Sequence, residues 1–223
     1  MWTKTSTFKN KHYWLEENLR FCEPHFRLEK VARIANAIAR RSHIDLLDIG
    51  CGTATLARLL QKNIAYFGID IAIHDPAPNL LELDITQNEI KFVGRSFDIV
   101  VMQGVLEYLG DLQRQKFAEI QHILRIGGKL IVTYVNFGHR AFCDNSGYNN
   151  IQSIEDLKED LQSFFDVERS FPTSHNWHRS ETEREWLKRI QLPLEANIPL
   201  LSRSLAVEYI FVCSPKPTNR LGQ

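Results

Sequence analysis

Three aspartates and two glycines have the types and spacing that could do chemistry in this chain. The stretch LLDIGCGTATLARLL places Asp48 at the end of an apolar run, just ahead of Gly50 and Gly52. The next two apolar runs end at Asp70, in YFGIDI, and at Asp84, in LELDIT. If these runs form neighbouring parallel strands, their carboxyl ends meet at one edge of the sheet, and the three acids line one crevice.

The residues around the glycines argue against a phosphate ligand. A dinucleotide-binding turn follows G-x-G-x-x-G, but Thr55 takes the third glycine position, and no Gly-Lys-Ser/Thr of a phosphate loop follows. A carboxylate at Asp48 would repel a pyrophosphate but suits a ligand with an ammonium group and a sulfonium. Asp70 stands where a carboxylate can accept both ribose hydroxyls, and Asp84 where one can reach the amine of an adenine. S-adenosylmethionine fits this pattern.

Regular elements must position these acids. Apolar positions at three- and four-residue spacing predict a helix over residues 25–41. Helical periodicity returns in TATLARLLQKN, in DLQRQKFAEIQHILR, which we expect Gly127 and Gly128 to end, and in SIEDLKEDLQSF. FFDVERSF and SLAVEYIFVCS read as two last strands. Nearly continuous apolar runs predict strands buried on both faces, as in a parallel sheet, at 44–49, 65–70, 79–85, 97–103 and 129–135.

The motifs in this order resemble those of the class I, Rossmann-like S-adenosylmethionine-dependent methyltransferases. LLDIGCGTATLARLL is similar to the first motif of that family, YFGIDI to its acidic-loop motif and LELDIT to its adenine motif. SFDIVVMQGVLEYLGD and ILRIGGKLIVT resemble its fourth-strand and fifth-strand motifs, so the resemblance covers roughly residues 25–137. It implies an α/β fold with a doubly wound, mostly parallel sheet, an antiparallel last strand, helices on both faces and a lid segment inserted between the last two strands.

The resemblance also implies a donor site, with S-adenosylhomocysteine as the product. The residues that would bind the donor come from the ends of four strands: Asp48, Gly50, Cys51 and Gly52 at the methionine part, Asp70 and Ile71 at the ribose and adenine, Asp84 and Ile85 at the adenine edge, and Gln103 and Gly104 on the sulfonium side. Similar proteins cover the donor with N-terminal residues, for which Tyr13, Trp14 and Arg27 are candidates here.

We expect one methyltransferase domain over residues 1–223. Its parts are N-terminal cap helices at 1–42, a donor-binding core at 43–137, and two long connections, 138–152 and 172–201, that would form the acceptor pocket or a lid.

Candidate catalytic residues lie in the two connections. A general base would be needed there to deprotonate an acceptor hydroxyl, and His139, His175 and His178 are the candidates. Glu107 stays open between an acid of the pocket and a solvated start of a helix.

The composition of the chain argues against some classes of binding partner. Lys plus Arg and Asp plus Glu number 27 each, so the chain offers no overall electrostatic footprint for a nucleic acid. The four cysteines are scattered, which suits free thiols in a reducing compartment and predicts no metal site. Neither a signal peptide nor a membrane span is evident, so we expect a cytoplasmic protein without stable membrane insertion.

The expected function is methyl transfer to a small-molecule or carrier-linked acceptor, at an oxygen by analogy alone. A protein or RNA acceptor ranks lower, because the end of the fourth strand lacks an Asn/Asp-Pro-Pro-Tyr run and no Pro-Cys pair is present. Two other interpretations stay open: a non-catalytic S-adenosylmethionine-binding regulator or scaffold, and a nicotinamide-dependent oxidoreductase.

Overall fold

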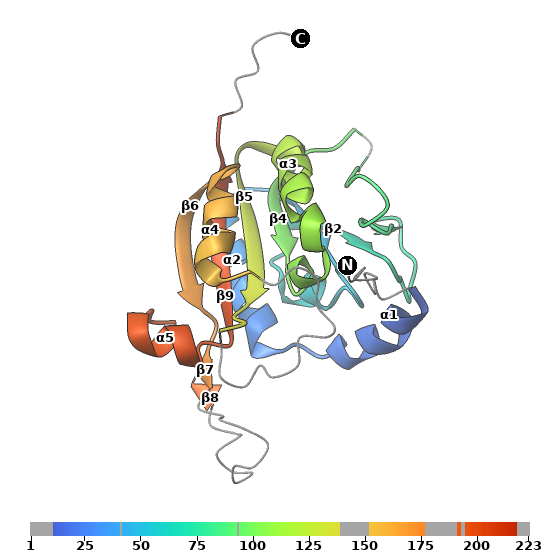
Figure 1. Cartoon of the computed structure of the whole chain (residues 1–223). Coiled ribbons are helices and arrows are strands. Elements are labelled where there is room, and N and C mark those ends of the chain that lie inside the picture. Colours follow the sequence, from blue (N-terminus) through green and yellow to red (C-terminus); the bar gives the residue numbers. More distant parts are fainter. Residues whose placement is uncertain are drawn as a thin grey trace, which may run out of the picture.

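A seven-stranded sheet forms the centre of the computed structural model (Figure 1), which describes residues 11–40, 42–92, 94–138, 152–176, 191–192 and 195–217. The strand order is β3-β2-β1-β4-β5-β9-β6. Strands β3, β2, β1, β4 and β5 run parallel, whereas β9 is antiparallel to both of its neighbours. The predicted doubly wound sheet with an antiparallel last strand is confirmed. The strands are β1 (Ile44–Ile49), β2 (Ile64–Asp70), β3 (Leu80–Glu82), β4 (Phe97–Met102), β5 (Leu124–Val135), β6 (Phe165–Pro172) and β9 (Glu208–Pro215).

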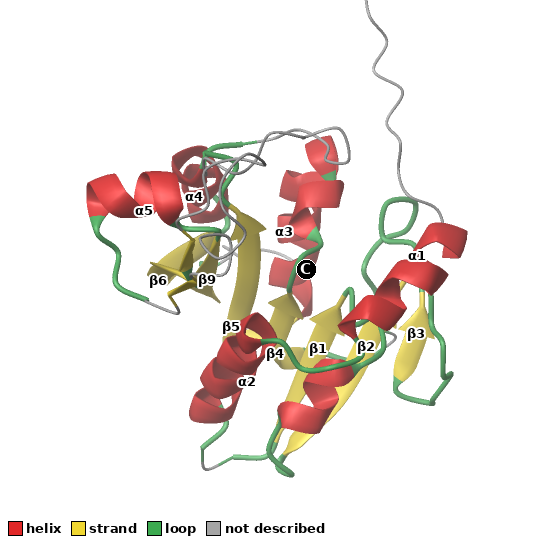
Figure 2. Ribbon diagram, turned by 90° about the horizontal axis from the view of Figure 1, so that it is seen from below, coloured by secondary structure: helices red, strands yellow, loops and turns green. Residues whose placement is uncertain are grey.

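Helices cover both faces of the sheet, as predicted (Figure 2). Helix α2 (Phe26–Ile38) packs on one face, and α3 (Gln113–Ile123) and α4 (Ile154–Gln162) pack on the other. Two short helices, α1 (Lys11–Glu17) and α5 (Pro199–Leu205), lie at the edges of the molecule.

Strand residues alternate between two hydrophobic clusters, which explains the continuous apolar runs. On β4, Ile99 and Val101 belong to the cluster beneath α2, whereas Val100 and Met102 belong to the cluster beneath α3 and α4. All four side chains are fully buried. Because both faces of the sheet are packed against apolar side chains, the strand ends are held rigidly at one edge.

Two predicted helix features are wrong in detail. The stretch TATLARLLQKN forms only a short 3-10 turn, Thr55–Leu59, which Leu60 ends in an extended conformation. Helix α3 does not run to Gly127, because Leu124 already pairs with Phe97 of β4. Gly127 instead lies within β5 with a φ of 78°. The register between β4 and β5 shifts nearby, so this glycine belongs to an irregular strand start.

The two long connections are described only in part. Residues 139–151 lie outside the described residues, as do 177–190 and 193–194. Between β6 and β9 the chain forms a two-stranded pair, β7 (His175–Asn176) with β8 (Gln191–Leu192), followed by α5. The insertion therefore lies where it was predicted, and its role as a lid stays a prediction. None of the helices in the described part of the chain is both long and apolar enough to cross a lipid bilayer.

Candidate active site

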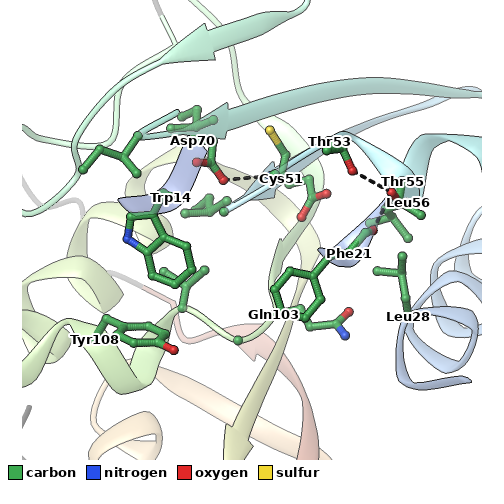
Figure 3. A pocket seen from close by; sticks show the side chains of 18 of the residues that line it. Trp14, Phe21, Leu28, Cys51, Thr53, Thr55, Leu56, Asp70, Gln103 and Tyr108 are labelled. Carbon is green, nitrogen blue, oxygen red and sulfur yellow. Dashed lines mark hydrogen bonds between the residues drawn. The ribbon is translucent and has the colours of Figure 1, made fainter. Parts of the chain in front are cut away.

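A cavity of about 340 Å³ opens at the carboxyl ends of β1, β2 and β4 (Figure 3). Such edges are the usual ligand sites of doubly wound sheets, because the strand order reverses there. The cavity brings together all ten residues expected at the donor site, which are Asp48, Gly50, Cys51, Gly52, Asp70, Ile71, Asp84, Ile85, Gln103 and Gly104. Their individual roles toward a donor stay predictions.

The turn after β1 needs glycine for two separate reasons. Gly50 has a φ of 78°, a left-handed conformation that other residues rarely adopt. A β-carbon on Gly50 would also lie 2.1 Å from Cγ2 of Val105, far inside van der Waals contact. The turn therefore passes close beneath the residues that follow β4, which brings the backbones of the two strand ends together.

Cys51 lies in the same turn and packs against β2. A β-carbon on Gly68 would lie 2.7 Å from its sulfur, so the thiol fills the space that Gly68 leaves. Burial, with Asp48 and Asp70 nearby, raises the pKa of the Cys51 thiol far above its ordinary value. A thiol that stays protonated is a poor nucleophile, so Cys51 acts as packing.

Asp70 holds the glycine turn in place. Its Oδ2 accepts a hydrogen bond of 2.7 Å from the Gly52 N–H, and its Oδ1 accepts one of 2.9 Å from the Ala72 N–H. A carboxylate offers about four lone-pair positions. The side chain can therefore fix the turn and still accept hydrogen bonds from a ligand.

Asp48 is buried beside the turn and close to Asp70. The Tyr66 hydroxyl donates a hydrogen bond of 2.8 Å to its Oδ2. Burial raises the pKa of Asp48 to about 7, with Asp70 adding to the rise and Tyr66 opposing it. In the absence of a cation this carboxyl is half protonated near neutral pH.

Asp84 lies just past β3, at the other end of the row of acids. Its Oδ1 accepts hydrogen bonds from the Thr86 N–H at 2.9 Å and from the Thr86 hydroxyl at 2.7 Å. These bonds close a tight turn that faces the cavity, with Ile85 buried beside it.

Two more buried acids line the cavity beyond β4. Glu107, in the 3-10 turn after β4, is 1% exposed, and its Oε1 accepts a hydrogen bond of 2.9 Å from the Val135 N–H. Glu208, the first residue of β9, is also 1% exposed and pairs with Val135 in the register of the two strands. Burial raises the pKa of both carboxyls, that of Glu107 to about 7.

Arg27 lies close to Glu208 and lowers the pKa of both acids. Its guanidinium Nη1 lies 3.5 Å from Oε1 of Glu208. Arg27 is the only lysine or arginine among the described residues that line the cavity. The cavity therefore carries an excess of acidic groups over basic ones.

Two N-terminal aromatic residues, Trp14 and Phe21, line the cavity, and the covering of a donor by N-terminal residues stays a prediction. The rings of Trp14 and Tyr108 meet edge to face, with centroids 5.1 Å apart (Figure 3). The ring of Tyr13 packs on that of Trp14. The Thr55 hydroxyl donates a hydrogen bond of 2.9 Å to the Phe21 carbonyl. The residue at the missing third glycine position thus ties the N-terminal segment to the glycine turn.

Of the three histidines expected as bases, only His175 belongs to the described residues, and it does not line the cavity. His175 is buried in β7, where its Nε2 lies 2.8 Å from the Ser202 hydroxyl, and it is not among the lining residues. His139 and His178 lie outside the described residues. His25 does line the cavity, but its Nδ1 accepts from the Arg27 N–H as a helix cap, and burial and Arg27 lower its pKa.

Some lining residues escaped the sequence motifs. Glu208 stands inside the apolar run AVEYIFVC, and an isolated acid in a strand buried on both faces is a signal that could have marked it. Glu107 is now placed in the cavity wall rather than on a solvated helix start. Val135 and Phe21 carry no sequence signal, because they reach the cavity only through the fold.

Comparisons with known proteins find methyltransferases with the same fold. A family model described as a methyltransferase domain matches residues 14–197. The N-methyltransferase NodS of Bradyrhizobium japonicum WM9, solved with S-adenosylhomocysteine, is similar at 16% identity, with 94% of this chain and 100% of that chain covered and a TM-score of 0.58. Among curated protein sequences, none matches this chain significantly.

Two further solved structures share the fold. A SAM-dependent methyltransferase from Archaeoglobus fulgidus is 17% identical, with coverage of 92% and 100% and a TM-score of 0.62. Magnesium protoporphyrin IX methyltransferase (ChlM) of Synechocystis PCC 6803, solved with SAM, is 14% identical, with coverage of 91% and 84% and a TM-score of 0.55. The chain belongs to the methyltransferase domain family, and its fold is that of the class I S-adenosylmethionine-dependent enzymes.

The close approach at Gly50 gives a prediction for stability. We expect Gly50→Ala to lower the free energy of unfolding by about 3 kcal/mol or more, because clash and backbone strain add. The double variant Gly50→Ala with Val105→Ala removes the clashing methyl and should recover part of the loss, leaving the left-handed strain of roughly 1–2 kcal/mol. Urea denaturation of both variants measures this. A double variant no more stable than the single one would show that Val105 does not limit the turn.

The ion pair of Arg27 and Glu208 gives a second prediction. We expect Arg27→Met to destabilise the protein by about 2 kcal/mol at pH 8, because Glu208 would remain buried and uncompensated. Adding Glu208→Gln to Arg27→Met should restore much of this stability. The control is Arg33→Met, since Arg33 is 69% exposed and its loss should change stability by under about 0.5 kcal/mol. Thermal unfolding measures all three, and a double variant as unstable as Arg27→Met would contradict the pairing.

Proposed function

We propose that the cavity binds S-adenosylmethionine and that the protein transfers its methyl group to a small-molecule or carrier-linked acceptor. The observation that carries this proposal is the concentration of buried carboxyls, Asp48, Asp70, Glu107 and Glu208, around one cavity whose described lining residues include a single arginine. Buried acids of this kind repel phosphate and stabilise cations. S-adenosylmethionine carries two positively charged groups, an ammonium and a sulfonium, and no phosphate.

The donor would lie across the ends of β1, β2 and β3. Its amino group would meet Asp48, and its ribose hydroxyls would meet the carboxylate of Asp70 at the end of β2. The adenine would reach the turn at Asp84. The sulfonium would then face Gly104, where a β-carbon would meet no atom within 4 Å. This open side is the route by which an acceptor could approach the methyl group.

The protein's main contribution to catalysis would be alignment. Methyl transfer is an in-line displacement on an already activated sulfonium, and holding the two reactants in line supplies roughly 7–11 kcal/mol. An acceptor hydroxyl, which analogy favours, or an acceptor amine must lose a proton during methylation, so a general base is needed. Glu107 lines the acceptor side and has a pKa near 7, so it is a better placed base than any described histidine of the long connections.

Turnover distinguishes an enzyme from a scaffold. Incubating the purified chain with methyl-labelled S-adenosylmethionine and a panel of alcohols, phenols, amines, thiols and carboxylic acids should yield S-adenosylhomocysteine with a labelled acceptor, both identified by mass spectrometry. Donor binding without turnover across the panel would favour the regulatory or scaffold alternative. Absence of donor binding in calorimetry would overturn the proposal itself.

Asp48 makes donor affinity depend on pH. Its pKa of about 7 in the free protein should fall when the donor ammonium lies beside it, so binding releases a proton. Affinity should therefore rise as pH rises from 5.5 to 7.5, by up to about tenfold per unit. Asp48→Asn should bind more weakly at pH 7.5 and lose most of this dependence. Calorimetry with S-adenosylhomocysteine at several pH values measures it, and an unchanged pH profile in Asp48→Asn would remove Asp48 from the donor site.

A further inference from the structure

The acceptor side of the cavity contains an acid that the donor does not use. Glu107 is 1% exposed, and one of its oxygens is occupied by the Val135 N–H. The other oxygen, Oε2, is buried and has no hydrogen-bond partner among the described residues. The side-chain oxygen of Gln103, four residues earlier along the chain, is likewise buried without a described partner. Both residues line the cavity.

Buried oxygens without a described hydrogen-bond partner point to a ligand with hydrogen-bond donors. They are Oε2 of Glu107, the side-chain oxygen of Gln103 and both carboxyl oxygens of Glu208, and all three residues line the cavity. Leaving a buried acceptor without a partner costs about 1–3 kcal/mol, and more when the group is charged. Such an arrangement is typical of a site that a substrate completes. A carboxylate oxygen and an amide oxygen both require N–H or O–H groups.

Of the two acids, Glu107 is the less well compensated among the described residues. Glu208 faces it across the end of β5 and raises its pKa, but Glu208 already has Arg27 at 3.5 Å. Tyr134, which is buried nearby, adds no positive charge. Arg27 also lowers the pKa of Glu107, but its guanidinium lies beside Glu208, and no lysine or arginine of the described residues forms an ion pair with Glu107.

We propose that the methyl acceptor is a primary or secondary amine, bound as an ammonium between Glu107 Oε2 and the side-chain oxygen of Gln103. The proposal rests on the proposed function and names its acceptor class. An ammonium supplies the positive charge that Glu107 lacks and at least two N–H donors for the two oxygens. A neutral hydroxyl supplies one donor and no charge, and a carboxylate or phosphate acceptor would be repelled.

Aromatic side chains on the same cavity wall favour a cation as well. Trp14 and Tyr108 both line the cavity, and their rings meet there edge to face (Figure 3). Aromatic faces attract ammonium groups, the more so where water is excluded. The acceptor's carbon skeleton would pack on the same rings.

The Glu107 carboxylate, the amine and the methyl donor are sufficient for the chemical step. The ammonium first transfers one proton to the Glu107 carboxylate, which frees the nitrogen lone pair. The lone pair then forms a bond to the donor methyl carbon while the carbon–sulfur bond breaks, and its electrons stay on sulfur. The products are S-adenosylhomocysteine and a methylated ammonium, and Glu107 later releases its proton to solvent.

Binding of matched amines and alcohols tests the acceptor class directly. The protein saturated with S-adenosylhomocysteine is titrated with butylamine and butanol, benzylamine and benzyl alcohol, and phenethylamine and phenethyl alcohol, followed by ligand-observed NMR. We expect the amine that binds most tightly to have a dissociation constant at least tenfold lower than that of its matched alcohol. Equal or tighter binding of the alcohols, or no binding of any amine, overturns the proposal.

Glu107→Gln tests the residue. Glutamine keeps the shape and can still accept from the Val135 N–H, but it presents an amide N–H₂ where Oε2 was. We expect the amine preference to disappear and N-methylation of the best amine to fall by 100-fold or more. The control Glu159→Gln removes the same charge on the exposed face of α4 and should change neither value. An amine preference that survives in Glu107→Gln overturns the role of this residue.

Failure of this proposal is distinguishable from failure of the proposed function. Calorimetry with S-adenosylhomocysteine reports the donor site in wild type and in Glu107→Gln, where we expect dissociation constants within about twofold. Donor binding with methylation of alcohols but not of amines would reject the amine acceptor and leave the methyltransferase intact. Loss of donor binding in wild type would reject both.

Discussion

The hydrogen bonds that Asp70 accepts from the Gly52 and Ala72 N–H groups hold the site together. The bond from Gly52, at 2.7 Å, ties the glycine turn after β1 to the end of β2, and the bond from Ala72, at 2.9 Å, fixes the Asp70 side chain in the loop after β2. The turn can adopt this path because Gly50 has no β-carbon where Val105 approaches. The parallel register of β1 and β2, buried on both faces, fixes the two ends against each other. The Gly50 and Cys51 N–H groups also donate to the Ile69 carbonyl, at 2.7 and 3.1 Å, so the acids at the ends of β1 and β2 line one cavity.

The electrostatics of the cavity follow from that arrangement. Carboxyls that are removed from water and placed near one another resist ionisation, as the raised pKa values of Asp48 and Glu107 show. A cationic ligand reverses this penalty, because its charge stabilises the ionised acids. The same acids would make a pyrophosphate costly to bind. This electrostatic preference is the basis on which we propose a sulfonium donor and an ammonium acceptor.

The sheet, its buried strands and a set of residues that line the cavity could be predicted from the sequence, because hydrophobic patterning and glycine–acid spacing are local signals; that these residues bind a donor stays a prediction. Helix α4 was also readable, since Ser153 and Asp156 form the reciprocal cap that their spacing suggests. The acceptor side was not readable in the same way. Glu107 and Glu208 lie 101 residues apart and meet only because β9 pairs with β5 in one particular register. The expectation of a histidine base arose from the long connections, but the described His175 is buried against Ser202 instead.

The central claim is that acids at the strand ends select a phosphate-free adenosine with a cationic tail. Its most direct test is a calorimetric comparison of S-adenosylmethionine with NAD at pH 7.5 on the same preparation of the protein. We predict saturable binding of S-adenosylmethionine at micromolar concentrations and no detectable heat from NAD. Binding of NAD without binding of S-adenosylmethionine would contradict the account and favour a nicotinamide-dependent oxidoreductase.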